Sequence, residues 1–309
     1  MALGLVVAAC SSDAATPSTS SASAAGAPPS TAVRDGATIY SVGDHSVPVG
    51  LAYDGHNVWV LNSLAETVSK IDAASGALTT YPTGGFPLGV TFDGTSLWFT
   101  NQADGTVSKM DPQDGTTTTY PAGDGAYAVE FDGTDIWVAN TRANTVTKVN
   151  PADGTSKSFA VGSGPDGIAL ERGNVWVANA ADNTISRLDP TTGEHTDFPT
   201  GESPADVVFD GTNIWVANYA GDSVSRIDPA TGTKTDFPVG IKPGELAYDG
   251  TSIWVANSGS VPGTLSQVDS KTGATKEHPA GGSPSSVLVV DGTIWEANSD
   301  TNDVWTFAP

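Results

Sequence analysis

Apolar and polar residues alternate with a period of two over short stretches of the chain. Turns rich in Asp, Gly, Pro and Thr separate these stretches. In DGTNIWVANYAGDSVSRIDPATGTKTDFPVG, residues 210–240, the alternation predicts strands at 213–218, 223–227 and 233–237. A further strand is predicted at 205–209, before the Asp-Gly turn. The apolar residues do not recur every three or four positions, so the sequence predicts an all-β protein.

Close copies of this unit fill the chain from about residue 37 to its end. A tryptophan marks each of the seven copies at steps of 39, 39, 39, 39, 39 and 41 residues: Trp59, Trp98, Trp137, Trp176, Trp215, Trp254 and Trp295. A period near 40 with four short strands per copy is typical of a β-propeller. The sequence therefore predicts a seven-bladed propeller with four-stranded blades.

The last copy contains only three of its four strands, the third at 303–307. Residues 38–42 match the missing strand, because Tyr40-Ser41-Val42-Gly43 resembles Phe237-Pro238-Val239-Gly240 of the fifth copy. We expect this N-terminal strand to complete the last blade and to remove its exposed edge. The propeller then spans residues 37–309.

The leader begins MALGLVVAAC, an apolar run that ends in Val-Ala-Ala-Cys. This ending resembles the lipobox of bacterial lipoproteins, which implies a signal segment at 1–10 and a lipid on Cys10. Residues 11–36 are almost wholly Ser, Ala, Thr, Pro and Gly, a composition that predicts a disordered tether. Together they predict an extracytoplasmic protein that is anchored to the bacterial cell membrane by its lipid alone.

The charge balance argues against a nucleic-acid partner. The chain has 13 Lys and Arg against 35 Asp and Glu, for a formal net charge of −22. Phosphate backbones would be repelled, and no basic stripe offsets the acidic charge. Phosphate-binding loops and HExxH or CxxC motifs are absent from the sequence. We expect a monomer whose partner is a protein, a glycan or a small molecule.

The copies, such as DGTNIWVAN and SRIDPATGTKTDFPVG, resemble the repeats of streptogramin B (virginiamycin B) lyase-like and YncE-like seven-bladed propellers. In the lyase, a histidine commonly follows the proline that opens an inner strand. Histidine, glutamate and a magnesium ion then open a cyclic depsipeptide by elimination at its ester. None of the equivalent positions here is a histidine: Val49, Leu88, Tyr127, Asp166, Ala205, Gly244 and Ser285.

One face of the propeller is the predicted binding face. The start of each first strand and the loop after each second strand should lie at the same end of a blade, around the central channel. These loops open with Asn in every copy, and Asn179, Asn218 and Asn257 either cap turns or contact a ligand. His45, with Asp44, extends the loop that leads into the first inner strand on the same face.

Departures from the repeat are the best candidates for function. Asp166, Asp206 and Glu245 stand at the starts of three neighbouring inner strands, where other copies carry Gly, Ala, Leu or Ser. They are predicted to hold Ca²⁺ or Mg²⁺ with help from Asn amide oxygens, to bind a cationic ligand, or to share a proton. The remaining alternative is three independent, solvated carboxylates. Three further departures would add stacking and one positive charge: Tyr127, Tyr219 and Arg142.

Two classes of function follow. The first is a surface-anchored propeller that binds a ligand or partner on this face without catalysis. The second is a metal-assisted, streptogramin lyase-like C–O lyase or a lactone hydrolase that uses Asp166, Asp206 and Glu245 as metal ligands or base. The missing histidines favour the first class.

Overall fold

The structure is a computed structural model that describes residues 31–34 and 36–309. The predicted signal segment with Cys10, and most of the predicted tether, lie outside the described residues. Across the described part of the chain, no helix is long and apolar enough to cross a membrane.

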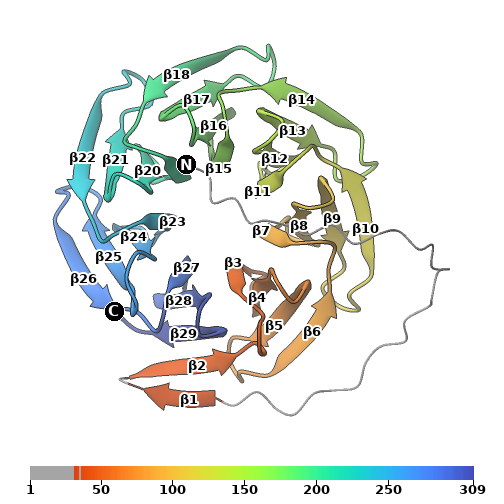
Figure 1. Ribbon diagram of the computed structural model, residues 1–309. Coiled ribbons are helices and arrows are strands. Elements are labelled where there is room, and N and C mark those ends of the chain that lie inside the picture. The colour runs from red at the N-terminus through yellow and green to blue at the C-terminus, as the bar shows by residue number, and fades with distance from the viewer. Residues whose placement is uncertain (1–30, 35) are drawn as a thin grey trace, which may run out of the picture.

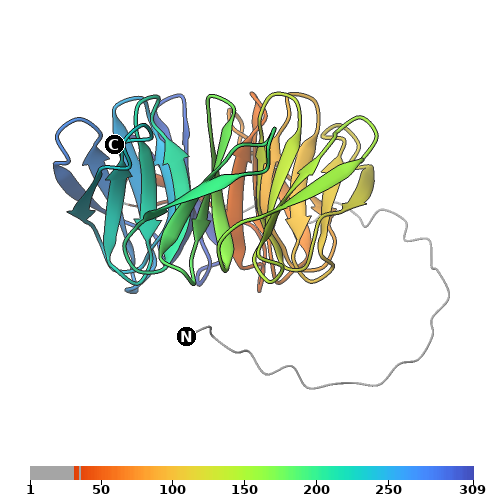
Figure 2. The same ribbon diagram turned by 90° about the horizontal axis from the view of Figure 1, so that it is seen from above.

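Seven antiparallel sheets surround a central channel, as predicted (Figure 1). Six sheets have four strands and the seventh has five. The strands run between the two faces of the disc, so that the loops collect on both faces (Figure 2).

The strands occupy equivalent positions in successive blades. The innermost strands are β3 (Pro48–Tyr53), β7 (Pro87–Phe92), β11 (Ala126–Phe131), β15 (Pro165–Glu171), β19 (Pro204–Phe209), β23 (Pro243–Tyr248) and β27 (Pro284–Val290). The second strands are β4 (Asn57–Asn62), β8 (Leu97–Asn101), β12 (Ile136–Asn140), β16 (Asn174–Asn179), β20 (Ile214–Asn218), β24 (Ser252–Asn257) and β28 (Thr293–Asn298). The third strands are β5 (Thr67–Asp72), β9 (Thr106–Met110), β13 (Thr145–Val149), β17 (Thr184–Leu188), β21 (Ser223–Ile227), β25 (Thr264–Asp269) and β29 (Asp303–Phe307). The outer strands are β6 (Leu78–Pro82), β10 (Thr117–Pro121), β14 (Ser156–Ala160), β18 (His195–Pro199), β22 (Lys234–Pro238), β26 (Thr275–Pro279) and β2 (Ala37–Ser41).

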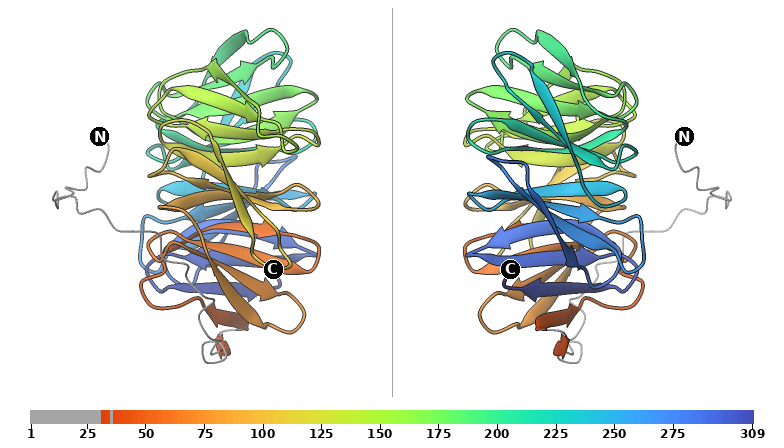
Figure 3. Two further views of the ribbon diagram at one scale, coloured as in Figure 1. Left: turned by 90° about the vertical axis from the view of Figure 1, so that its right-hand side faces the viewer. Right: turned by 90° about the vertical axis from the view of Figure 1, so that its left-hand side faces the viewer.

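The ring closes through its N-terminal strand. β2 pairs with β29, and the two strands lie side by side at the rim (Figures 1 and 3). The Tyr40 ring stacks on Trp295 of the same blade with centroids 5.5 Å apart. One detail differs from expectation: Thr31–Arg34, inside the predicted tether, form strand β1 and pair with β2. The predicted tether therefore ends before Thr31.

Each tryptophan of the repeat is buried and packs against a ring on the outer strand. The Trp215 and Phe237 rings pack at a tilt with centroids 5.6 Å apart, and those of Trp254 and His278 do so at 4.9 Å. The turn glycine of the next blade covers six of the outer rings, whereas His278 lies beside Phe307. Gly273 has a φ of +75°, and a Cβ there would overlap the Phe237 ring. Glycine is therefore needed at this turn both for its backbone conformation and for the close packing of two blades.

In five blades the Asp-Gly turn holds the tryptophan from the other side, because the indole N–H donates to the Asp carboxylate. In the sixth blade, Asp249 accepts hydrogen bonds from the backbone N–H of Thr251 and Ser252 and, at 2.8 Å, from Nε1 of Trp254. Burial acts to raise the pKa of Asp249, but the hydrogen bonds from Trp254 and the turn outweigh it, so the pKa is lowered. The ionised carboxylate is therefore a structural part of the blade.

Asp249→Ala should lower the free energy of unfolding by about 2 kcal/mol, because it leaves the buried Trp254 N–H without an acceptor and removes the turn's hydrogen bonds. Chemical denaturation at pH 7 measures this loss. Thr118→Ala, on an exposed outer strand, is the control. Equal stability of the two variants would show that the turn carboxylate does not support the blade.

The closing blade carries a buried acid that the other blades lack. Glu296 in β28 replaces the Val of the IWVAN pattern and has no exposed surface. Its Oε1 accepts hydrogen bonds from Gly281 and Asn298, whereas Oε2 has no partner. Burial raises the pKa of Glu296 to about 7. Its ionisation is therefore unfavourable in the folded ring.

Glu296→Gln should increase stability at pH 8 but not at pH 4. A carboxyl whose folded pKa lies above its unfolded value loses stability as the pH rises from about 4.3 towards 7. The shift corresponds to as much as ~3 kcal/mol. Denaturation curves across pH 4–8 measure the difference between variant and wild type, with Glu194→Gln at an exposed turn as the control. A difference that does not depend on pH would contradict the account.

Candidate functional site

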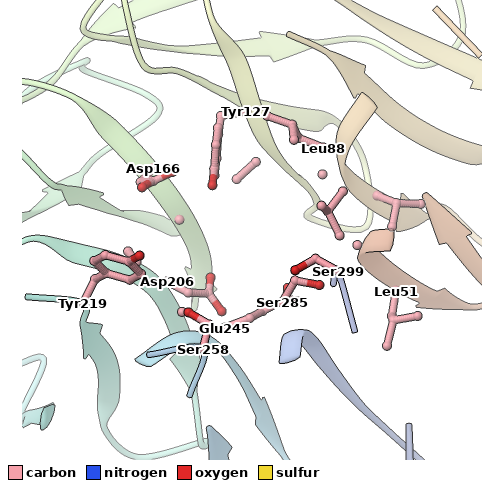
Figure 4. Close-up of a pocket in the computed structure, with 18 of the residues that line it drawn as sticks. Leu51, Leu88, Tyr127, Asp166, Asp206, Tyr219, Glu245, Ser258, Ser285 and Ser299 are labelled. Atoms are coloured by element: carbon pink, nitrogen blue, oxygen red, sulfur yellow. The ribbon is translucent and has the colours of Figure 1, made fainter. Parts of the chain in front are cut away.

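The central channel opens as a cavity of about 630 Å³. Its walls are the first residues of the inner strands, and its mouth includes Tyr219, Ser258 and Ser299 from loops after second strands. Both sets of residues lie at the same end of the blades, as the repeat predicted. Figure 4 shows the side chains that line this cavity.

A bulge in the inner strands directs two successive residues towards the channel. The pairing of β15 with β16 shifts between Pro165 and Ile168, and the same irregularity occurs in β19 and β23. A bulge leaves the extra residue out of the ladder and reorients its side chain. Asp166, at the second position of its strand, and Asp206, at the third, therefore both line the cavity.

Asp166, Asp206 and Glu245 do converge on one channel. Asp206 lies between the other two along the ring, and its Oδ2 accepts a hydrogen bond from the Leu246 N–H at 2.9 Å. Glu245 accepts one from the Ser286 hydroxyl, also at 2.9 Å. Oδ1 of Asp166 is buried and has no hydrogen-bond partner.

Burial raises the pKa of all three carboxyls, and the charge of Asp206 adds to the effect on Asp166 and Glu245. Burial, followed by the charge of Asp206, raises the pKa of Asp166 to about 8. Burial raises the pKa of Asp206 to about 6, partly offset by its hydrogen bond from Leu246. The pKa of Glu245 lies well above its usual value because of burial and the nearby Asp206. At pH 7 the channel therefore holds protons that water-exposed carboxylates would release.

The sequence reasoning missed a fourth carboxyl, Glu130. It lines the same cavity from β11, and burial together with Asp206 raises its pKa to about 8. A signal was available, because Glu130 pairs with Trp137 at a position where other blades carry Ala, Thr, Val or Leu. Glu130 lies deeper in its strand than Asp166, Asp206 and Glu245 do in theirs.

Two tyrosines lie at the same side of the channel, as predicted. Tyr127 and Tyr219 are each 37% exposed and line the cavity near Asp166 (Figure 4). The charge of Asp166, followed by burial, raises the pKa of Tyr127. Lys242 at the rim places its Nζ 5.8 Å from the centre of the Tyr219 ring.

The opposite side of the channel is neutral. The seventh, first and second blades contribute Ser285, Val49 and Leu88, with Leu51 and Val90 deeper in the wall. The cavity is thus divided into an acidic, aromatic half and a neutral, largely apolar half. Such a division suits a ligand with one charged and one apolar part.

Three predicted ligand-binding asparagines are not available to a ligand in the channel. Asn179, Asn218 and Asn257 are buried inside their blades and do not line the cavity. The side-chain amide of Asn218, for example, donates to the hydroxyls of Ser223 and Ser225 at 3.1 and 2.9 Å. These amides join the second strand to the third, which explains why Asn recurs in every blade.

Arg142 and His45 also lie outside the cavity lining. The Arg142 guanidinium forms an ion pair with Asp124 at 2.8 Å and donates to the Gln102 carbonyl. His45 is exposed on its loop with a φ of +58°. Neither residue supplies the positive charge or the imidazole that the sequence placed near the channel.

The carboxyls do not form a ready metal site. Within residues 31–34 and 36–309, no group of three or more His, Cys, Asp or Glu side chains is arranged to hold a metal ion. Asp166, Asp206 and Glu245 line the same channel, but their carboxyl groups are not arranged as ligands of one ion. Binding of Ca²⁺ or Mg²⁺ therefore stays a prediction that melting experiments can test.

Comparison with known proteins identifies the fold. No protein-family model matches the chain, and no curated protein matches it in sequence. A streptogramin B lyase structure is similar with a TM-score of 0.77 at 20% identity, over 87% of this chain and 97% of that one. A hydrazine synthase structure from Kuenenia stuttgartiensis has a TM-score of 0.77 at 18% identity, over 86% and 97% of the two chains.

A third similar structure is the extracellular domain of a one component system from B. thetaiotaomicron. Its TM-score is 0.70 at 17% identity, over 86% of this chain and 41% of that one. At these identities the likeness concerns the propeller fold alone, which serves many unrelated functions. The function has to be argued from the channel.

Proposed function

We propose that this protein is a non-catalytic binding propeller whose ligand occupies the central channel. The observation that carries the proposal is the cavity of about 630 Å³, with four carboxyls and two exposed tyrosines on one side and a neutral wall on the other. Volumes of roughly 300–1,000 Å³ are typical of small-molecule sites.

The exposed large apolar side chains support the choice of face. Among the described residues they all lie in the channel or in loops on the face where it opens: Leu64, Phe86, Tyr127, Tyr219, Ile241 and Val261. Apolar side chains gathered on one face of a soluble domain are typical of an interaction surface.

A variant that fills the channel tests the proposal. Ala205 lines the cavity and its side chain makes no hydrogen bond, so Ala205→Trp should obstruct the channel without removing a structural contact. Thr118→Trp, on the exposed outer strand β10, is the matched control. A library of cationic, neutral and anionic compounds of about 150–300 Da is screened by protein-observed NMR, and melting curves verify that both variants fold.

We expect compounds that bind the wild type and the Thr118→Trp variant but not Ala205→Trp. Compounds that bind all three proteins alike would place binding outside the channel and contradict the proposal. The same proteins can be incubated with cyclic esters and lactones. Turnover by the wild type that Ala205→Trp loses would instead favour the alternative, a streptogramin lyase-like C–O lyase or lactone hydrolase.

We further propose that a lipid on Cys10 holds the propeller at the outer side of a bacterial membrane. The Val-Ala-Ala-Cys ending and the Ser-, Ala- and Pro-rich segment that follows support this proposal. Cys10→Ser should release the protein from the membrane fraction and abolish labelling by a fatty-acid analogue. Membrane association that survives the substitution would contradict it.

A further inference from the structure

We propose that the channel ligand is a protonated primary or secondary amine with an apolar body, an inference that rests on the proposed function of the channel as a ligand site. Four features of the cavity support it: the sign of its charge, an unpartnered acceptor, its aromatic rings and its neutral wall.

The titratable groups favour a cation over an anion, because the channel carboxyls can release protons and pair with a cation, whereas an anion would find only Lys242. The titratable groups that face the cavity come from β11, β15, β19, β23 and the loops between blades: Tyr127, Glu130, Asp166, Asp206, Tyr219, Lys242 and Glu245. Four of these are carboxyls, and Lys242 at the rim is the only cation among the lining residues. The strands of the other three blades contribute neutral residues, so a ligand cation would meet acidic groups without a competing inner cation.

Asp166 requires a hydrogen-bond donor. Its Oδ1 is buried without a partner, whereas Asp206 and Glu245 each accept a hydrogen bond from the protein. A buried acceptor without a partner is unfavourable, and a ligand N–H would supply one. A quaternary ammonium has no N–H. The unpartnered oxygen therefore favours a primary or secondary amine over a quaternary one.

The aromatic rings and the neutral wall account for the rest of the ligand. Tyr127 and Tyr219 expose part of their rings beside Asp166, and an ammonium over a tyrosine ring is attracted to its face. Val49, Leu51 and Leu88 lie across the cavity. An amine nitrogen at Asp166 thus leaves the apolar body against the opposite wall.

Amine binding should release protons. Asp166 and Glu130 hold protons at pH 7 because their pKa is raised, and a nearby cation favours the ionised carboxylate. The affinity for an amine should therefore rise between pH 6 and pH 8. For each proton released on binding, the rise is up to about tenfold per pH unit. A neutral ligand of the same shape should show no such rise.

Isothermal titration of the full chain with four related probes tests the inference: tryptamine, its N,N,N-trimethyl derivative, tryptophol and indole-3-propionate. These share an indole and differ in the charge and N–H donors of the side chain. We expect tryptamine to bind at least tenfold more tightly than tryptophol, the trimethyl derivative to fall between them, and indole-3-propionate not to bind. Titrations of tryptamine in buffers of different ionisation enthalpy should show proton release at pH 7.

Two substitutions test whether the Asp166 carboxylate itself, and not the overall negative charge of this face, is responsible for amine binding. Asp166→Asn should weaken tryptamine binding by roughly tenfold to a hundredfold, because the amide can accept the hydrogen bond but cannot carry the negative charge that strengthens it. Asp124→Asn removes a carboxylate on the same face that pairs with Arg142 outside the cavity, and should leave the affinity unchanged. Since Asp166 holds a proton at pH 7 and Asn has nearly the same shape as the protonated acid, Asp166→Asn should fold at least as stably as the wild type.

The outcomes separate the two proposals. If tryptophol or indole-3-propionate binds as tightly as tryptamine and Ala205→Trp abolishes that binding, the channel is a ligand site but the amine inference is wrong. If tryptamine binds equally to the wild type and Ala205→Trp, or none of the probes binds at millimolar concentration, the amine inference fails. The proposed function is then tested separately, by screening the wider library against the wild type and the Ala205→Trp variant.

Discussion

Removal of the closing strand is expected to destabilise the ring more than any single substitution in its blades. A chain that lacks residues 1–41 loses the pairing of β2 with β29 and the buried Tyr40 ring that stacks on Trp295. Deletion of a buried aromatic side chain alone costs about 3–5 kcal/mol. The edge of β29 also becomes exposed and available for aggregation.

Loss of the Tyr40 ring alone should lower the melting temperature by about 6–10 °C, since roughly 2 °C corresponds to 1 kcal/mol for a domain of this size, and loss of the strand pairing should lower it further. A chain that lacks only residues 1–30 is the matched control, because it keeps both β1 and β2, and should melt within about 2 °C of the full chain. A synthetic peptide of residues 31–43 should restore part of the loss, because a strand that binds only the folded ring stabilises it. If both truncated chains melt alike, β2 does not close the ring.

Neutralising two channel carboxyls is expected to stabilise the ring at alkaline pH. In the Asp166→Asn, Glu130→Gln double variant, the two groups with pKa of about 8 are replaced by amides. Their folded pKa lies above the unfolded values of about 4, so the wild type loses stability as the pH rises from 4 to 8. We expect the variant to gain about 3 kcal/mol at pH 8, less than the full shifts imply because channel water screens the charges.

The matched control is Asp124→Asn, Glu194→Gln, which makes the same two replacements at exposed positions. Denaturation at pH 5 and pH 8 should show a gain for the channel variant that is several times larger at the higher pH. A variant that is less stable than the wild type at pH 8 would contradict the burial of these charges. Repeating the measurement with Ca²⁺, Mg²⁺ or a chelator tests the metal prediction, because a metal held by the carboxyls would stabilise only the wild type.

The fold could be predicted from the sequence because the sequence is a repeat. Seven evenly spaced tryptophans, alternation by twos and the Asp-Gly turns predicted the number of blades and the strands within each. The shortened last copy and the match at Tyr40 predicted the closure. β1 was missed, because the composition of residues 11–36 carries no strand pattern and its pairing with β2 is a contact outside the repeat.

The candidate site was predicted only in part. Asp166, Asp206, Glu245 and the two tyrosines line the channel as expected, because equivalent positions of a closed repeat must meet around its axis. The prediction that Arg142 supplies a positive charge to the channel was wrong, because Asp124 pairs with it. The spacing along the repeat does not reveal this ion pair. The asparagines do not contact a ligand in the channel, because their amides donate to hydroxyls on the adjacent strand inside each blade.

The central claim, that carboxyls from neighbouring blades form one buried acidic site, is tested most directly by an NMR titration of the carboxyl carbons. The account predicts that Asp166 and Glu130 titrate near pH 8 and Asp206 near pH 6, whereas the turn carboxyl of Asp249 titrates below its usual range. Titration of Asp166, Glu130 and Asp206 near pH 4, as for solvated acids, would contradict the claim. The channel would then hold independent, solvated carboxylates.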